Sequence, residues 1–184
     1  MKLKRTLFLL LVAVLPLQLA AKITLPAIFT DNMVLQQQSD VKIWGKAKPG
    51  KTVKVTTSWN RKTYEVRAGE SGHWRATVST PAAGGPYTVT VSDGKPVELK
   101  NVLIGEVWLC SGQSNMEIPV QGGRDCPIEH AQEIIVESAQ YPDVRLFSVK
   151  IDGGLRPKED VTGAWCEASP RTVKTFSAIG YLFG

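Results

Sequence analysis

The stretch Thr52-Val53-Lys54-Val55-Thr56-Thr57 alternates apolar and polar side chains, residue by residue. An earlier stretch, Val41-Lys42-Ile43-Trp44, shows the same period of two, and Lys48-Pro49-Gly50-Lys51 supplies a turn between them. Because successive side chains of a strand point to opposite faces, this period indicates strands with one buried face. We expect the valines and the isoleucine of both stretches to be buried and the lysines between them to face solvent.

Further β-rich runs continue this pattern as far as Asn101. They lie at Thr63–Arg67, His73–Val78, Tyr87–Ser92 and Val97–Ile104, with turn signals such as Gly69–Gly72 and Asp93-Gly94 between them. Short strands at this spacing, with no helical period, predict an all-β antiparallel sandwich over residues 22–101.

The pattern changes over residues 102–184. The unbroken apolar run Val107–Cys110 is typical of a strand buried on both faces. Apolar residues at helical spacing follow in Ile128–Gln140, then a second strand at Val144–Val149 and an apolar helix at Phe176–Phe183, with Ser177 as its cap. This order predicts the start of a parallel α/β sheet. Two strands and so few helices cannot cover both faces of such a sheet, so we expect this domain to be incomplete in the chain.

The first 21 residues predict a signal peptide. Lys2, Lys4 and Arg5 precede an apolar run at Leu7–Leu15, and Leu19-Ala20-Ala21 offers small residues for cleavage. The run is shorter than the roughly 20 residues that a bilayer span needs, although an uncleaved N-terminal anchor is the alternative. We therefore expect an exported protein, periplasmic or extracellular, with no membrane attachment after cleavage.

Charge and cysteine usage exclude some function classes. Three of the positive charges behind the net charge of +5 lie in the predicted signal, and the remainder forms no basic stripe, so no nucleic-acid partner is expected. Cys110, Cys126 and Cys166 are odd in number and lack close C-x-x-C spacing, and the chain has only His73 and His130. A structural metal site is therefore not expected.

Ser114 stands in a loop of small and polar residues just beyond the predicted strand at 107–110. Active sites of α/β folds are built at the carboxyl ends of strands. The loop is not the G-x-S-x-G elbow of lipase-type hydrolases, because Met116 replaces the second glycine. Local chemistry alone fits an ordinary polar loop equally well.

A longer comparison of motifs favours the catalytic interpretation. The stretch Gly105-Glu106-Val107-Trp108-Leu109-Cys110-Ser111-Gly112-Gln113-Ser114-Asn115-Met116 resembles the nucleophile block of the sialate O-acetylesterase family, which belongs to the SGNH class of serine hydrolases. The resemblance extends to Phe29–Gln36, Val41–Gly45, Ser71–Trp74, Gly85–Tyr87, Trp165–Pro170 and Phe176–Tyr181. It implies an accessory β-domain at 22–101 followed at 102–184 by the first part of a flavodoxin-like SGNH hydrolase domain.

The resemblance implies a role for Ser114. This serine would attack the acetyl carbonyl of an acetylated sugar or glycan and become acetylated, and its backbone N–H would donate to the oxyanion. Gly112, Gln113 and Asn115 would shape and support the loop, and no metal or cofactor is implied. Ser111 is the rival hydroxyl, but it lies outside the Gly-Gln-Ser-Asn core of the motif.

The base that the family uses is not found in the chain. Family members take it from an Asp-x-x-His late in the hydrolase domain, and further oxyanion donors from later loops. We expect His73 to lie on a strand face and His130 to be solvated, with Asp125 and Asp143 as turn residues. The residues present are therefore expected to be inactive alone.

Two other functions stay open. The first is a noncatalytic carbohydrate-binding β-sandwich with a vestigial α/β tail, suggested by the tryptophans. Trp44 and Trp74 follow strand patterns and are expected in the core, whereas Trp59, beside a turn, is the better candidate for exposure. The second is a periplasmic structural domain. The sequence does not distinguish sialic acid from other acetylated sugars, or set the oligomeric state.

Overall fold

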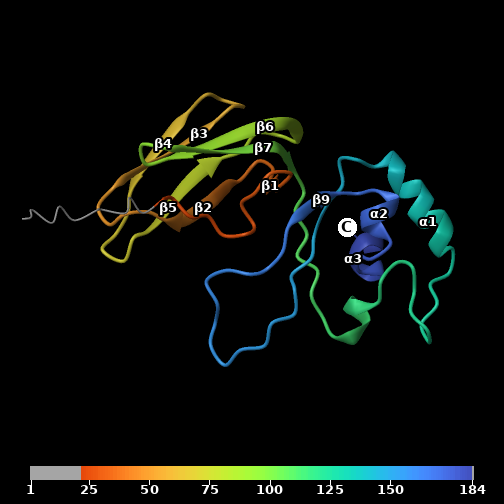
Figure 1. Cartoon of the computed structure of the whole chain (residues 1–184). Helices are drawn as coiled ribbons and strands as arrows, with labels where there is room; N and C mark the ends of the chain where they lie inside the picture. The colour runs from red at the N-terminus through yellow and green to blue at the C-terminus, as the bar shows by residue number, and fades with distance from the viewer. Residues whose placement is uncertain (1–21, 184) are drawn as a thin grey trace, which may run out of the picture.

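The computed structural model describes residues 22–183, so the predicted signal peptide lies outside the described residues. A β-rich part is followed by a part with short helices (Figure 1). The elements are β1 (Val34–Gln36), β2 (Asp40–Lys46), β3 (Thr52–Thr57), β4 (Thr63–Arg67), β5 (His73–Ser79), β6 (Gly84–Ser92), β7 (Pro96–Gly105), the 3-10 helix η1 (Ser114–Glu117), α1 (Ala131–Glu137), the 3-10 helix η2 (Ser138–Gln140), β8 (Arg145–Phe147), β9 (Trp165–Glu167), α2 (Pro170–Val173) and α3 (Ala178–Phe183).

The β-rich part contains two sheets. One has five strands in the order β1-β7-β6-β3-β4, and the other pairs β2 with β5. All pairs are antiparallel except β1 and β7, which run parallel with Val34 opposite Leu103. The expectation of a purely antiparallel sandwich is therefore wrong at this edge. The physical reason is connectivity, since β1 leads into β2 of the other sheet and no hairpin turn fixes its direction.

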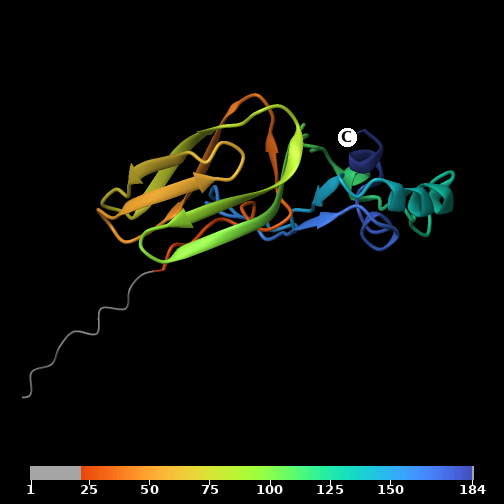
Figure 2. The same cartoon turned by 90° about the horizontal axis from the view of Figure 1, so that it is seen from above.

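One apolar core lies between these sheets, as the alternation predicted. Ile43, Val53 and Val55 are fully buried, while Lys42 and Lys54 are exposed. Val41, which was also expected to be buried, is half-buried and packs against this core. The same core includes Trp74, Val78, Val89, Val91 and Val102 from the other strands. Figure 2 shows the strands enclosing this core at one end of the molecule and the helices at the other.

The exposure of the tryptophans differs in part from the expectation. Trp74 is 3% exposed and belongs to the core, as predicted. Trp44 is 37% exposed, because the alternation that buries Ile43 turns Trp44 to the outer face of β2. Trp59 is half-buried, its ring lies against Tyr87, and its Nε1 donates to the Ser79 carbonyl at 3.1 Å. The predicted exposures of Trp44 and Trp59 are therefore wrong.

The strand expected at 107–110 does not form. Trp108 is 59% exposed and Leu109 92% exposed, and no strand within residues 22–183 pairs with them. A strand without a neighbour leaves its backbone groups unpaired, so this apolar run stays irregular. The strand expected at 144–149 is present as β8, but it pairs antiparallel with β9, with Arg145 opposite Glu167. The described residues thus contain no parallel sheet in this part.

The predicted helices are present but short. The helical pattern at 128–140 gives α1 and η2, and α3 begins after Ser177, whose Oγ accepts from the Gly180 N–H at 3.2 Å as a cap. They pack around a second small core of Val120, Ile135, Leu146, Ala168, Val173 and Ala178. No helix between residues 22 and 183 has the length and hydropathy of a bilayer span.

A polar network joins the two parts. The Arg145 side chain is only 4% exposed, and its Nη1 lies 3.2 Å from Glu167 Oε1. Its guanidinium also donates to Asn32 Oδ1 at 3.4 Å and Asn101 Oδ1 at 3.5 Å. Asn101 Nδ2 in turn donates to Asn32 at 2.8 Å and to Glu167 at 2.9 Å. A buried guanidinium is thus held by acceptors from β9 and from the β-rich part.

A second contact nearby fixes the same junction. Trp165 Nε1 donates to the Ile28 carbonyl at 2.8 Å.

The predicted domain boundary between residues 101 and 102 falls inside β7, which runs on to Gly105. That boundary stays a prediction.

Replacing Glu167 by Ala should destabilise the chain by about 3 kcal/mol, because within residues 22–183 it removes the one carboxylate that pairs with a buried guanidinium. Urea unfolding of the chain measures this. The control is Glu98→Ala, whose exposed carboxylate pairs with Lys100 at 3.4 Å and whose loss should cost less than about 0.5 kcal/mol. Adding Arg145→Met to Glu167→Ala should restore part of the lost stability. Equal losses for Glu167→Ala and Glu98→Ala would contradict the role given to Arg145.

Candidate active site

Ser114 is the first residue of η1, and Gln113 before it is extended, with φ −117° and ψ −152°. The Met116 N–H donates to the Gln113 carbonyl at 2.9 Å and closes the turn. Ser114 is exposed, and its Oγ has no hydrogen-bond partner within residues 22–183. The turn therefore presents a free serine hydroxyl to solvent.

The glycine before this serine has a steric role. A Cβ built on Gly112 would lie 2.8 Å from Met116 Cγ, closer than real Cβ contacts allow. Met116 is half-buried and folds back across the glycine, so any larger residue at 112 would displace it. Gln113 and Asn115 are exposed, and the Asn115 carbonyl accepts from the Ile118 N–H at 3.4 Å. The predicted supporting roles of their side chains stay predictions.

The loop is anchored where it leaves β7, through a cluster that we call the Glu106 clamp (Gln36, Gln37 and Glu106). Gln36 Nε2 and Gln37 Nε2 donate to the two carboxylate oxygens of Glu106 at 2.8 and 2.7 Å. Gln36 Oε1 accepts from the Val107 N–H at 2.9 Å, and Gln37 Oε1 accepts from the Ala83 N–H at 2.9 Å. Two side chains at the end of β1 thus hold the first residues of the serine loop.

The clamp also lowers the pKa of Glu106. Hydrogen bonds from Gln36, and next from Gln37, stabilise its carboxylate and hold its pKa below the ordinary value for glutamate. Because that pKa is lowered on folding, the clamp's contribution is present above the unfolded pKa and is lost as pH falls through the folded one. The charged clamp is therefore intact at neutral pH. Sequence reasoning missed it, although Gln36 and Glu106 both fall within the stretches that carry the family resemblance.

The segment after η1 is anchored as well. The Val120 and Gln121 N–H groups donate to the carbonyls of Phe176 and Lys174 at 2.9 and 3.0 Å. The Ala178 N–H donates back to the Ile118 carbonyl at 2.8 Å, so α3 begins beside the serine turn. Trp108 and Phe183 meet edge to face, with ring centroids 5.4 Å apart.

Neither histidine approaches Ser114. His73 lies exposed at the start of β5, with Nδ1 2.9 Å from Ser71 Oγ and Nε2 3.3 Å from Glu159. His130 is exposed at the N-terminus of α1, where its Nδ1 lies 2.7 Å from Glu133. Both placements agree with the expectation from sequence. Asp125 and Asp143 are exposed outside the helices and strands, also as expected.

The remaining candidate groups are the three cysteines, the possible metal ligands and Ser111. The thiols of Cys110, Cys126 and Cys166 are unpaired, and burial raises the pKa of the Cys166 thiol. Across residues 22–183, no group of three or more His, Cys, Asp or Glu side chains is placed to hold a metal ion. Ser111 is exposed and precedes η1. In the described part of the chain the structure thus presents Ser114 on a turn with Gly112, Gln113 and Asn115, and no side chain there forms a hydrogen bond with its Oγ.

Comparisons with known proteins agree with the resemblance. The chain is 32% identical to the sialate O-acetylesterase of Mus musculus over 86% of its own length, and 31% identical to that of Homo sapiens over 84%. It superposes with a TM-score of 0.79 on the crystal structure of a carbohydrate acetylesterase from Xanthomonas citri, at 32% identity, over 88% of this chain and 36% of that one. No family model matches the chain.

The chain and its relatives differ greatly in length. The chain spans about a third (32%) of the length of the curated relatives it matches. Within that span the matches confirm the expected resemblance, and the chain is a homologue of the sialate O-acetylesterases.

Proposed function

We propose that the complete protein is an exported carbohydrate O-acetylesterase that uses Ser114 as its nucleophile. The observation that carries this proposal is an exposed serine hydroxyl at the start of η1 that has no partner among residues 22–183, in a chain homologous to sialate O-acetylesterases. The Ser114 Oγ would attack the acetyl carbonyl, expel the sugar hydroxyl and form an acetyl-enzyme, which water then hydrolyses. The reaction would need neither metal nor cofactor.

The oxyanion of the tetrahedral intermediate needs hydrogen-bond donors. The backbone N–H of Ser114 is one candidate, because it begins η1 and has no acceptor in the described helix. The substrate class would be acetylated sialic acid or a related acetylated glycan.

A serine hydroxyl is a weak nucleophile until a base takes its proton. Within residues 22–183, both histidines pair with glutamates away from Ser114. We therefore assign the base to a residue outside this span, supplied in the complete protein.

Ser114→Ala in the complete protein should lower kcat/KM for an acetylated sugar by at least about a thousandfold, because the acetyl-enzyme can no longer form. The matched control is Ser111→Ala, which removes the neighbouring exposed hydroxyl and should leave most of the activity. Steady-state kinetics with thermal melts of both variants separate chemistry from folding. A fully active Ser114→Ala protein, or an inactive Ser111→Ala protein, would refute the assignment.

Residues 22–184 alone should show no more hydrolysis of p-nitrophenyl acetate than their Ser114→Ala variant. Oxyanion donors without a base leave only a small residual rate. Serine-dependent turnover by this segment would show that His73 or His130 reaches Ser114 after all.

Glu106→Ala in the complete protein should lower kcat roughly tenfold with little change in KM, because the serine loop loses its anchor while the substrate contacts remain. Amide hydrogen exchange over residues 107–115 should become faster. Glu98→Ala, on β7 and outside the clamp, is the control for both measurements. Unchanged kcat and unchanged exchange in Glu106→Ala would show that the clamp does not position Ser114.

A further inference from the structure

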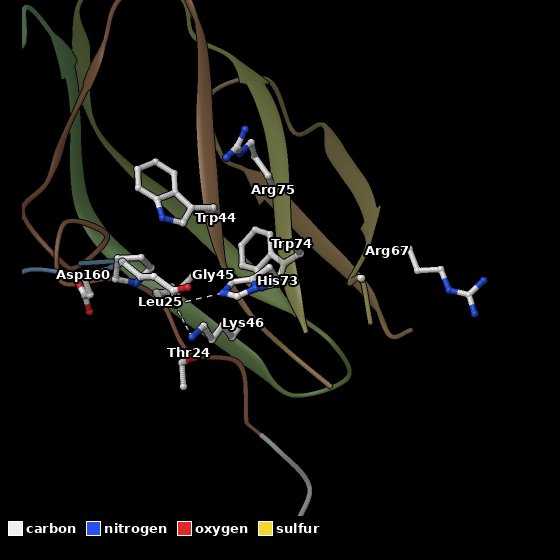
Figure 3. A pocket seen from close by; sticks show the side chains of 13 residues that line it. Thr24, Leu25, Trp44, Gly45, Lys46, Arg67, His73, Trp74, Arg75 and Asp160 are labelled. Atoms are coloured by element: carbon white, nitrogen blue, oxygen red, sulfur yellow. Dashed lines mark hydrogen bonds and ion pairs between the residues drawn. The ribbon is translucent and has the colours of Figure 1, made fainter. Parts of the chain in front are cut away.

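The outer face of the two-stranded β2–β5 sheet carries a cavity far along the chain from Ser114. In the strand register Trp44 lies opposite Arg75, and Lys46 lies opposite His73, so these four side chains share one face. They line a cavity of about 840 Å³, together with the segment 24–26 and the loop residues Glu159 and Asp160 (Figure 3). That volume lies within the usual range for small-molecule sites.

Trp44 offers a fixed aromatic surface in this cavity. Its indole is 37% exposed, although tryptophan is usually covered by the fold. The ring packs edge to face on the buried Phe29, with centroids 4.6 Å apart and planes at 84°. Because Phe29 holds the ring in place, a ligand stacking on it would lose little side-chain entropy.

Among the described residues that line the cavity, the Arg75 guanidinium is the cation without a partner. Lys46 Nζ and His73 Nε2 both contact Glu159, at 2.6 and 3.3 Å. Arg67 points away from the other lining side chains and donates to the Gly50 carbonyl at 3.0 Å (Figure 3). Within residues 22–183 the Arg75 guanidinium has no partner.

The nearby acidic side chains are already engaged. Asp160 Oδ1 accepts from the Ala27 and Val161 N–H groups at 2.9 and 2.8 Å. Glu159 forms an ion pair with Lys46 and a hydrogen bond with His73, and these contacts hold its pKa below the ordinary value. An incoming anion would therefore meet the unpaired Arg75 beside the fixed indole of Trp44.

We propose that this cavity is a noncatalytic binding site for an anionic sugar, a pyranose that carries a carboxylate. The apolar C–H face of the ring would lie on Trp44, since indole combines a flat apolar surface with a fixed geometry. The carboxylate would take two parallel hydrogen bonds from Arg75. A neutral sugar would leave the guanidinium unused, and an acidic peptide would leave the indole without a flat partner. The site does not depend on the role of Ser114.

The test is titration of the chain with glucuronic acid, N-acetylneuraminic acid, glucose and polyglutamate at low salt, followed by the NMR signals of the tryptophan indoles. The acidic sugars should bind with Kd of about a millimolar, as expected for one sugar ring on an open site. The Trp44 indole should shift, and Trp59, whose ring lies against Tyr87 and does not line the cavity, should not.

Three variants examine the proposed contacts. Trp44→Ala should weaken acidic-sugar binding at least about tenfold, and Trp44→Phe, which keeps a flat ring, should retain most of it. Arg75→Gln should weaken acidic sugars at least about fivefold without changing glucose binding. The matched control is Lys62→Gln, another exposed cation beside an aromatic ring, 4.9 Å from the Tyr64 centroid, and it should change nothing.

Each other outcome overturns the proposal. If neither acid binds, the cavity is not a sugar site. If glucose and glucuronic acid bind equally and Arg75→Gln has no effect, the site does not select sugars that carry a carboxylate. If polyglutamate alone binds, the face recognises acidic peptides instead.

Discussion

The buried guanidinium of Arg145 is bound by side chains from both parts of the chain. Arginine stays charged when buried, so its side chain needs acceptors wherever it lies. Glu167 supplies them from β9, and Asn32 and Asn101 supply them from the β-rich part. Both asparagines have positive φ, of 66° and 54°, a conformation that asparagine adopts more readily than most residues. Arg145 Nε is buried without a hydrogen-bond partner among the described residues, but the rest of its guanidinium is bound from both parts. These bonds give the β8–β9 hairpin a defined place against β1 and β7.

The serine loop is likewise held by residues from both parts of the chain. Its first residues are held by glutamines from the end of β1, and the residues after η1 are held by backbone hydrogen bonds to the segment before α3. The β-rich part therefore contributes to the position of the serine loop, because two of its side chains hold the residues where the loop begins. Such anchoring supports the proposed catalytic role of Ser114, since a nucleophile must be placed accurately to react.

Much of the β-rich part was predictable because period-two alternation reports directly which face is buried. The same alternation places Trp44 on the outer face, opposite in direction to the buried Ile43. The burial expected for Trp44 was therefore wrong, although the alternation itself indicated the correct face. The strand expected at 107–110 failed because an apolar run does not say whether a partner strand is present. Ser114 was found from its motif. The Glu106 clamp was not, because its members are about 70 residues apart and carry no local pattern.

The central claim is that the Ser114 hydroxyl is the reactive nucleophile of the complete protein. A fluorophosphonate probe reacts with activated serines, and peptide mass spectrometry locates the modified residue. We expect a single label on Ser114, blocked by prior incubation with an acetylated sugar and absent from Ser114→Ala. Labelling of Ser111, or an active protein that takes no label at Ser114, would contradict it.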